Sequence, residues 1–206
     1  MDHVRVPKDN MLGPRGGAFL VVQTHLGDGR IHHAMRTVGQ VQRALDMMLE
    51  RAVSRHTQGE MLGRKTDGAG HDRPELDRHR VLQLLVLHTV WKIDRYRDYK
   101  RVRKNISTVK ALRPRVFHDV AARALQIQGS LGVSNEMPFA AMVIESFHMG
   151  LADGPTEVHK ATLARGLLFA HAPNEGVFPS GRVPTRRTAA RERFAELLER
   201  SLDDKL

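Results

Sequence analysis

Apolar residues recur every three or four positions over a long stretch of the N-terminal half of the chain. The stripe comprises Ile31, Met35, Val38, Val41, Leu45, Met48, Leu49 and Val53. This spacing places the side chains on one face of an α-helix, so we predict an amphipathic helix over about residues 29–56. A helix of this kind is stable only when its apolar face packs against other elements.

Further helical patterns follow, separated by short polar or glycine-containing breaks. They predict helices at about 75–104, 109–128, 138–150, 156–170 and 187–204. Loops are predicted at 61–74 and 171–184, and the two glycines of Gln128–Ser134 end the third helix. The residues VRVP at 4–7 alternate as a strand does. The predicted fold is all-α, an antiparallel helical bundle with a short remnant strand at the N-terminus.

Composition limits the classes of function. Among 206 residues there is no cysteine, which excludes disulfides and zinc–cysteine sites, and no apolar run is long enough for a membrane span. No targeting segment is recognised at the N-terminus, so we expect a cytoplasmic protein. The net charge of +10 indicates either an anionic partner or a charge that only keeps the protein in solution, and it does not distinguish the two. The basic run Arg95–Lys104 is either a solvated helix face or the centre of a nucleic-acid-binding surface.

Four stretches, in this order and spacing, resemble the C-terminal half of the flavin-dependent acyl-CoA dehydrogenases. They are VRVPKDNMLGPRGGAF, GRIHHAMRTVGQVQRALDMMLERAVSRHTQG, ALQIQGSLGVS and LADGPTEVHKATLAR. The motif ADGPTEVHK is most similar to the branch whose larger eukaryotic members carry a kinase-like domain. The resemblance covers roughly residues 2–60 and 105–170. It implies oxidoreductase activity in fatty acid metabolism, with FAD as cofactor and an acyl-CoA thioester as substrate.

The resemblance assigns the catalytic base to Asp153, which would remove the α proton of the thioester while a hydride leaves the β carbon. A carboxylate suits this role because the thioester and the flavin acidify that proton. Most of the family has Glu at this position. Some members carry the base at the position of Gly29, which has no side chain here. Arg30 and Gly154 match residues beside the substrate. Taken without the resemblance, this stretch is a solvated turn with Thr156 as the N-cap of the next helix.

The resemblance also implies a set of cofactor-binding residues. They are Arg55, Thr57, Gln126, Ile127, Gln128, Gly129, Ser130 and Thr156. The family arginine reaches across a dimer interface to the flavin pyrophosphate, and a guanidinium pairs with phosphate oxygens bidentately. Gln58, Thr66 and Ser130 depart from the usual aromatic, Gln and Gly residues. Alternatively, the arginine is an ordinary helix C-terminal residue and QGSLG a helix-ending turn. No metal site is predicted.

The complete family subunit also contains an N-terminal helical domain and a middle β domain, for which this sequence has no counterpart. We therefore expect residues 1–17 to be a remnant of the middle domain with a linker, 18–171 to be the helical bundle, and 172–206 to be a loop with an amphipathic tail helix. A truncated frame, a fragment and a true half-subunit all fit. Expected partners are a second or further copies in a homodimer or homotetramer, a partner subunit, and electron-transfer flavoprotein. A non-enzymatic helical assembly module is the alternative.

Overall fold

The computed structural model describes the backbone of residues 2–203, and the side chains of these residues except 24, 25, 66–75 and 200–203. It consists of two compact units, with the boundary between Gly166 and Leu167. Within the described residues, no helix combines the length and apolar character that crossing a membrane requires.

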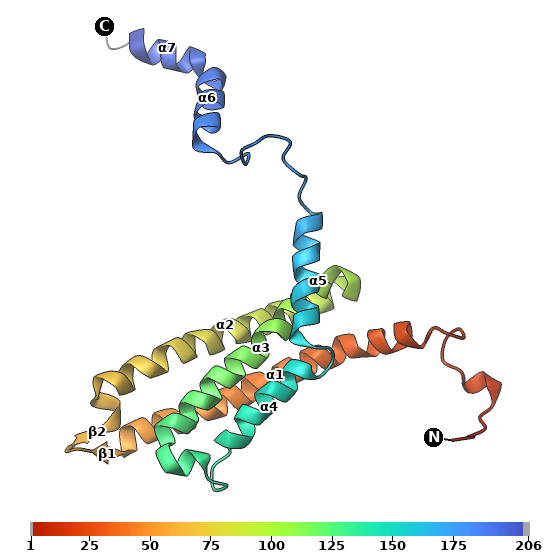
Figure 1. Ribbon diagram of the computed structural model, residues 1–206, viewed down its shortest axis with the longest axis vertical. Helices are drawn as coiled ribbons and strands as arrows, with labels where there is room; N and C mark the ends of the chain where they lie inside the picture. Colours follow the sequence, from red (N-terminus) through yellow and green to blue (C-terminus); the bar gives the residue numbers. More distant parts are fainter. Residues whose placement is uncertain (1, 204–206) are drawn as a thin grey trace. The chain divides into compact units, whose positions relative to one another are not determined.

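The first unit is an antiparallel helical bundle, as predicted. Its long helices are α1 (Ala18–Ser54), α2 (Thr66–Tyr96) and α3 (Tyr99–Gln128), and the shorter α4 (Phe139–Leu151) packs on α3. Figure 1 shows α2 returning along α1 after a tight hairpin. Helix α3 contacts all three of the others and supplies the largest share of the core, including Val109, Phe117 and Val120.

The connection between α1 and α2 differs from the predicted loop at 61–74. A two-stranded hairpin, β1 (His56–Thr57) and β2 (Glu60–Met61), is followed by the 3-10 helix η2 (Leu62–Arg64), and α2 already begins at Thr66. Gln58 and Gly59 have φ values of 52° and 80°. Two successive left-handed residues form the two-residue turn that best matches the twist of an antiparallel hairpin.

The predicted break between the second and third helices is also misplaced. Helix α2 ends at Tyr96, Arg97 adopts a left-handed conformation with φ 47°, and α3 begins at Tyr99. The carboxylate of Asp98 accepts hydrogen bonds from the backbone N–H groups of Lys100 at 2.8 Å and Arg101 at 3.4 Å. Asp98 is therefore the N-cap of α3, and the basic run bends at this point instead of forming one straight helix.

Some of the remaining predicted boundaries agree with the structure and others differ from it. The 3-10 helix η3 (Gly129–Val133) ends α3 as predicted, and α5 (Thr156–Phe169) follows Pro155. Helix α1 begins at Ala18, well before the predicted start at about residue 29, although Phe19 and Leu20 in its first turn are exposed. The expected strand at residues 4–7 is absent, and a 3-10 turn η1 (Lys8–Asn10) follows.

The second unit, taken by itself, contains the predicted tail helix in two parts. Helix α6 (Val183–Arg193) is followed by α7 (Ala195–Asp203). Phe194 separates them with φ −112° and ψ 21°, outside the helical range. The single helix predicted over 187–204 is thus corrected to two.

Candidate active site

The turn between α4 and α5 carries Asp153 in a conformation that is costly for a residue with a side chain. Asp153 has φ 59° and Gly154 has φ 99°. A left-handed residue other than glycine costs roughly 1 kcal/mol, although Asp tolerates it better than most. The Asp153 side chain is only 14% exposed, and its Oδ2 lies 3.6 Å from Nε2 of His33. Within the described residues, this buried Oδ2 accepts no hydrogen bond.

Two side chains hold the backbone of Asp153 from opposite helices. Arg30 on α1 donates through Nε to the Asp153 carbonyl oxygen at 3.1 Å, and Nε2 of His159 on α5 lies 3.4 Å from the same oxygen. The Nδ1 of His159 lies 3.3 Å from the hydroxyl oxygen of Ser107 on α3. Burial lowers the pKa of both Arg30 and His159. A neutral His159 that donates from Nε2 and accepts at Nδ1 fits both contacts.

Two fully buried cations of α3 cap the C-terminus of α4 directly before this turn. Lys110 Nζ donates to the carbonyl oxygens of Met149 at 2.8 Å and Gly150 at 3.1 Å. Arg113 donates to the carbonyl of Met149 and to that of Arg30, each at 3.1 Å. The last carbonyls of a helix have no partner within it, and cations there also interact favourably with the helix dipole. Arg113 therefore fastens α1 and α4 to the same side of α3.

Burial shifts the titration of these two cations. It lowers the pKa of Lys110 to about 8 and that of Arg113 to about 10. A nearby cation lowers each value further: Arg113 acts on Lys110, and Arg30 acts on Arg113. The negative charge of Asp153 acts in the opposite direction on both. The turn that carries Asp153 thus lies next to a buried positive cluster whose hydrogen bonds go to backbone carbonyls.

Thr156 does not cap α5 as the local sequence suggested. Its hydroxyl donates to the carbonyl of Gly150 at 3.1 Å, back toward the end of α4. The first turn of α5 instead begins from the carbonyl of Pro155, which accepts from the N–H groups of Val158 and His159. The Thr156 hydroxyl proton is committed within the turn, while the oxygen can still accept a hydrogen bond.

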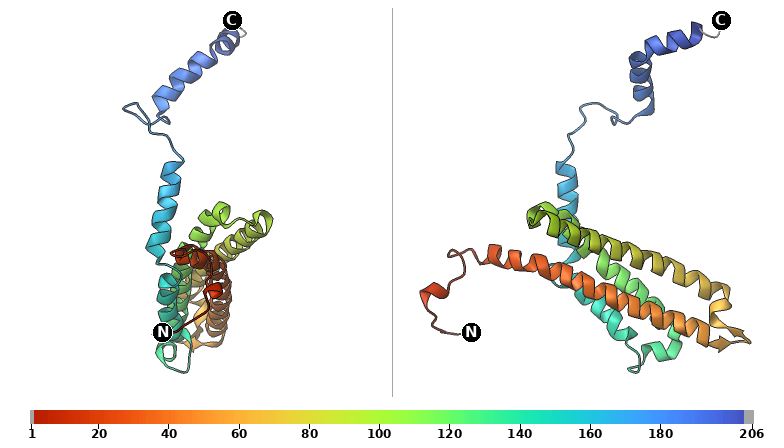
Figure 2. Two further views of the ribbon diagram at one scale, coloured as in Figure 1. Left: turned by 90° about the vertical axis from the view of Figure 1, so that its right-hand side faces the viewer. Right: turned by 180° about the vertical axis from the view of Figure 1, so that it is seen from behind.

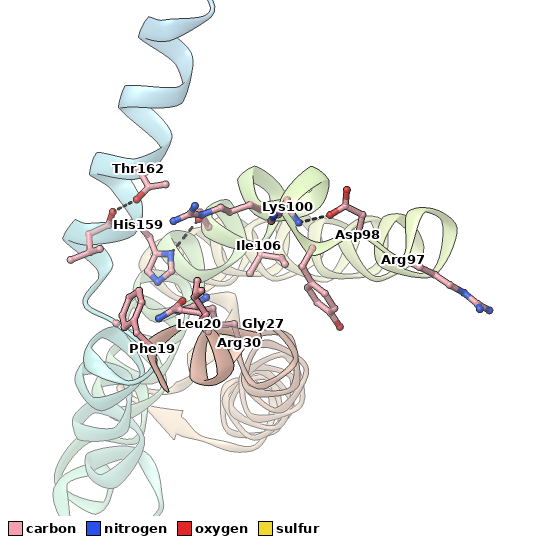
Figure 3. Close-up of a pocket in the computed structure, with 16 residues that line it drawn as sticks. Phe19, Leu20, Gly27, Arg30, Arg97, Asp98, Lys100, Ile106, His159 and Thr162 are labelled. Atoms are coloured by element: carbon pink, nitrogen blue, oxygen red, sulfur yellow. Dashed lines mark hydrogen bonds between the residues drawn. The ribbon is translucent and has the colours of Figure 1, made fainter. Parts of the chain in front are cut away.

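A cleft of about 910 Å³ lies beside this turn. Arg30 of α1, Gly154 of the turn and His159 of α5 line it together with apolar Phe19 and Ile106. Figure 3 shows Phe19 and Arg30 of α1 and His159 of α5 facing the same space. The cleft thus combines polar side chains at the turn with apolar side chains from α1 and α3.

The rim of the cleft is basic, and it comes from the segment where α2 passes into α3. Arg97, Lys100 and Arg103 line it, whereas Asp98 is the one acidic residue among the described side chains that line the cleft. The carboxylate of Asp98 is already engaged in capping α3. The sequence did not decide the role of the basic run Arg95–Lys104. In the structure, part of this run lines a cleft that Gly154 also lines.

The cofactor residues suggested by the sequence lie mostly at the other end of α4. Arg55 is the C-cap residue of α1, Thr57 is in β1, and residues 126–130 end α3 and begin η3. The hairpin and the α3–η3 junction lie at the same end of the bundle in Figures 1 and 2. Thr156 is separated from them by the length of α4, 13 residues or roughly 20 Å.

The residues of this second group differ in accessibility. Arg55, Gln126, Gly129 and Ser130 are exposed. Gly129 has φ 69°, and a Cβ added there would meet no atom within 4 Å, so another molecule can approach its backbone. Ile127 packs against the core, and the buried Gln128 donates to the carbonyl of Met47 at 3.4 Å. The side chains of these last two residues support the bundle.

Sequence reasoning missed four side chains of the site: His33, Lys110, Arg113 and His159. A signal existed for Lys110 and Arg113, which follow Ile106 at helical spacing and precede Val116 and Phe117 on an apolar face. A charged residue on such a face indicates a buried partner. The two histidines carried no such signal, because their partners are distant in sequence.

Comparison with known proteins places this arrangement in a family. Residues 16–168 match the profile described as acyl-CoA dehydrogenase, C-terminal domain. A Mycobacterium tuberculosis protein named as a probable acyl-CoA dehydrogenase, FadE2, is 38% identical over 81% of this chain and 40% of its own length. Acyl-CoA dehydrogenase family member 11 of Rattus norvegicus is 36% identical over 80% of this chain and 21% of its own length.

Solved structures agree in fold. A candidate acyl-CoA dehydrogenase from Mycobacterium abscessus has a TM-score of 0.76 and 34% identity, covering 82% of this chain and 41% of that chain. Butyryl-CoA dehydrogenase from Megasphaera elsdenii has a TM-score of 0.73 at 24% identity, covering 79% of this chain and 42% of that chain. The chain belongs to the acyl-CoA dehydrogenase family and corresponds to its helical C-terminal domain. It spans less than half the length of these relatives.

Proposed function

We propose that this chain supplies the C-terminal half of an FAD-dependent acyl-CoA dehydrogenase, which forms a carbon–carbon double bond between the α and β carbons of an acyl-CoA thioester. Asp153 is the base in this proposal, with Arg30 and Gly154 beside the substrate. In this proposal, residues 1–17 belong to the middle β domain of the family and a linker, 18–171 form the C-terminal helical bundle, and 172–206 form a loop with an amphipathic tail helix. Full activity requires the remaining domains or a partner that provides them.

The observation that carries the proposal is the state of the Asp153 carboxylate. The turn is fixed through its backbone carbonyl, so that Arg30 and His159 position Asp153 without donating to its carboxylate. A carboxylate oxygen that accepts no hydrogen bond keeps its lone pairs for a proton. Its position beside a cleft that contains Gly154 brings the base close to a site large enough for a thioester.

Bound FAD supplies the acceptor for the hydride that leaves the β carbon. Arg55, Thr57, Gln126, Gly129 and Ser130 fit its binding because they combine an exposed guanidinium, hydroxyl and amide groups with an open glycine backbone. Ile127 and Gln128 hold that loop on α1 and the core, and Thr156 offers an oxygen at the far end of α4. Cofactor binding by residues at both ends of the bundle suits an assembly in which two copies share each site.

The basic rim of the cleft supports a coenzyme A thioester as the substrate class. Arg97, Lys100 and Arg103 offer positive charge for phosphate groups, and Phe19 and Ile106 offer apolar contact for a chain. This arrangement accounts for the basic run without invoking nucleic acid. The excess of positive charge along the rim favours an anion over a neutral ligand.

Oligomerisation and electron transfer complete the proposal. Helices α1 and α2 expose large apolar side chains, among them Met35, Val53, Leu84 and Trp91, that a homodimer or homotetramer would bury. Electron-transfer flavoprotein is the proposed acceptor of the electrons after substrate oxidation. Neither the oligomeric state nor the electron acceptor bears on which residue is the base.

The first experiment is to incubate the purified chain with excess FAD, desalt it by size-exclusion chromatography, and record its absorbance spectrum. Retained flavin in an oligomeric peak supports a competent cofactor site. A colourless protein in the presence of a partner that supplies the missing domains would refute cofactor binding by this chain. Arg55→Ala should reduce flavin occupancy, while Lys160→Ala, which removes an exposed cation elsewhere, should leave occupancy unchanged.

The second experiment tests the base in the flavin-loaded assembly. Asp153→Asn should retain flavin but lose its reduction by acyl-CoA, because an amide cannot accept the α proton. Asn is the matched substitution, since it has the same shape and tolerates the left-handed backbone of this turn. Flavin reduction at the wild-type rate in this variant would assign the base to another residue.

A further inference from the structure

His33 faces the carboxylate of Asp153 from α1. Its Nε2 lies 3.6 Å from Oδ2 of Asp153, and the two side chains are 27% and 14% exposed. Both contain a buried polar atom, Nδ1 of His33 and Oδ2 of Asp153, that has no hydrogen-bond partner among the described residues. Buried polar atoms are usually paired, so two unpaired ones in adjacent side chains call for a functional explanation.

The relative position of the two groups is fixed by the surrounding helices. Arg30, three residues before His33 on the same face of α1, holds the Asp153 backbone carbonyl at 3.1 Å. His159 approaches the same carbonyl from α5. The turn is therefore held on α1 next to His33, and a small rotation of either side chain brings Nε2 and Oδ2 to hydrogen-bonding distance.

The charges around His33 favour its neutral form. Burial lowers the pKa of His33, and the cations Arg113 on α3 and Arg36 on α1 lower it further, as does the adjacent His32. Asp153 is the group that opposes them. A neutral imidazole has one nitrogen free to accept a proton. Once a proton has moved from Asp153 to His33, the carboxylate is charged again and stabilises the imidazolium against those cations.

We propose that His33 is the proton partner of Asp153, a role that rests on the proposed function of Asp153 as the base. The α C–H bond breaks and its proton bonds to Oδ2 of Asp153. The O–H bond then breaks as Nε2 of His33 takes the proton, which leaves the carboxylate restored and the imidazole protonated. No electrons are exchanged between the two residues. Neither residue takes part in the departure of the hydride from the β carbon.

This partnership explains why a short, nearly buried Asp can serve as the base repeatedly. At 14% exposure, Asp153 has little direct contact with water to which it could release a proton. His33 is about twice as exposed and provides the next step toward solvent. His33 acts through Asp153 and is a positioning and proton-accepting residue, without contact to the reacting carbon.

The first test uses the purified chain and needs neither cofactor nor substrate. Nuclear magnetic resonance titrations should follow the imidazole nitrogens of His33 and the side-chain carboxyl carbon of Asp153. In wild type, we expect the Asp153 signal to show a second inflection where His33 titrates, and this inflection should vanish in His33→Gln. The pKa of His33 should fall in Asp153→Asn, because the carboxylate that raises it is gone. Independent titration of the two residues would overturn the proposal.

The second test measures flavin reduction by acyl-CoA in the loaded assembly as a function of pH. His33→Gln should lower the rate about tenfold or more and change the acid side of the profile, because the decline caused by protonation of His33 is lost and only the decline caused by protonation of Asp153 remains. A purely structural effect would lower the rate and leave the shape of the pH profile unchanged, which would contradict the proposal. His148→Gln on the exposed face of α4 is the matched control, since His148 pairs with Glu145 instead.

The outcomes separate the two proposals. If Asp153→Asn abolishes reduction while His33→Gln has the wild-type rate and pH profile, the assignment of Asp153 as the base is supported and the proposed role of His33 is wrong. If Asp153→Asn reduces flavin normally, the proposed function of Asp153 fails. In that case, the magnetic resonance titration still determines whether the two residues share a proton.

Discussion

Replacing Lys110 by methionine should change how the stability of the bundle depends on pH. Lys110 is fully buried, and its ammonium donates to the carbonyl oxygens of Met149 and Gly150. Methionine has similar length and no charge. Each carbonyl keeps a second donor, Arg113 for Met149 and Thr156 for Gly150, so the substitution leaves neither of them unpaired. The main change is therefore the removal of a buried charge.

The magnitude follows from the lowered pKa. Burial reduces the pKa of Lys110 from 10.5 to about 8, equivalent to about 3 kcal/mol for keeping the lysine charged in the folded chain. Between these two values the unfolded chain binds more protons than the folded chain, so this group makes wild type more stable as pH rises. The uncharged side chain of Lys110→Met would make no such contribution. We expect the variant to be at least as stable as wild type at pH 7.

The assay is urea unfolding of both proteins, followed by far-ultraviolet circular dichroism at several pH values. The stability of Lys110→Met relative to wild type should fall by about 2 kcal/mol between pH 7 and pH 9.5. Lys160→Met, at an exposed lysine of α5, is the matched control and should follow wild type at each pH. A difference between Lys110→Met and wild type that does not vary with pH would refute the reasoning that burial dominates the titration of Lys110.

Three further predictions concern packing and acid stability. Gly132→Ala should destabilise the chain by about 1–3 kcal/mol in the same urea assay, because the new Cβ would lie 2.2 Å from the backbone oxygen of Leu125; stability equal to wild type would contradict this. Gly39→Ala should stabilise α1 by roughly 1 kcal/mol, since the new methyl meets no atom within 4 Å and Ala favours helix; a lower unfolding midpoint would indicate an unseen contact. His79 is buried against Gln42, and burial lowers its pKa, so stability should be lost as pH falls below about 6.5. His79→Gln should lessen that loss, and an identical acid profile for the two proteins would assign the loss to other groups.

Sequence periodicity predicted the bundle because its signal is local. Within the stripe from Ile31 to Val53, the periodicity located Val41, Leu45 and Met48, which are buried in the core, although Met35, Leu49 and Val53 of the same stripe are exposed. The break at Arg97 and Asp98 was misplaced for a related reason. Their charges read as part of a continuous basic run, whereas the structure uses Asp98 as a cap and Arg97 as a left-handed terminus. Apolar periodicity contains no information about either role.

The site was predictable only in part because it is assembled across long sequence separations. Asp153 and Arg30 entered through resemblance to a family, and they do meet, although they are 123 positions apart. Arg30 contacts the carbonyl and not the carboxylate, a distinction that no sequence pattern specifies. His33 and Arg113 converge on the same turn from two other places in the chain. Such convergence depends on how α1, α3 and α4 cross.

The hydrogen bonds of the cations explain how a site with several positive charges can still contain a carboxylate oxygen that is free to accept a proton. Arg30, Lys110 and Arg113 all donate to backbone carbonyl oxygens around the turn, and Oδ2 of Asp153 accepts no hydrogen bond from the part of the chain that the structure describes. A direct hydrogen bond to a carboxylate stabilises its charged form and weakens it as a base. Bonds to the neighbouring carbonyls instead fix the turn in its left-handed conformation while leaving Oδ2 open toward His33. The cations thus fix the geometry of the turn, and this is the arrangement that the proposed proton transfer between Asp153 and His33 requires.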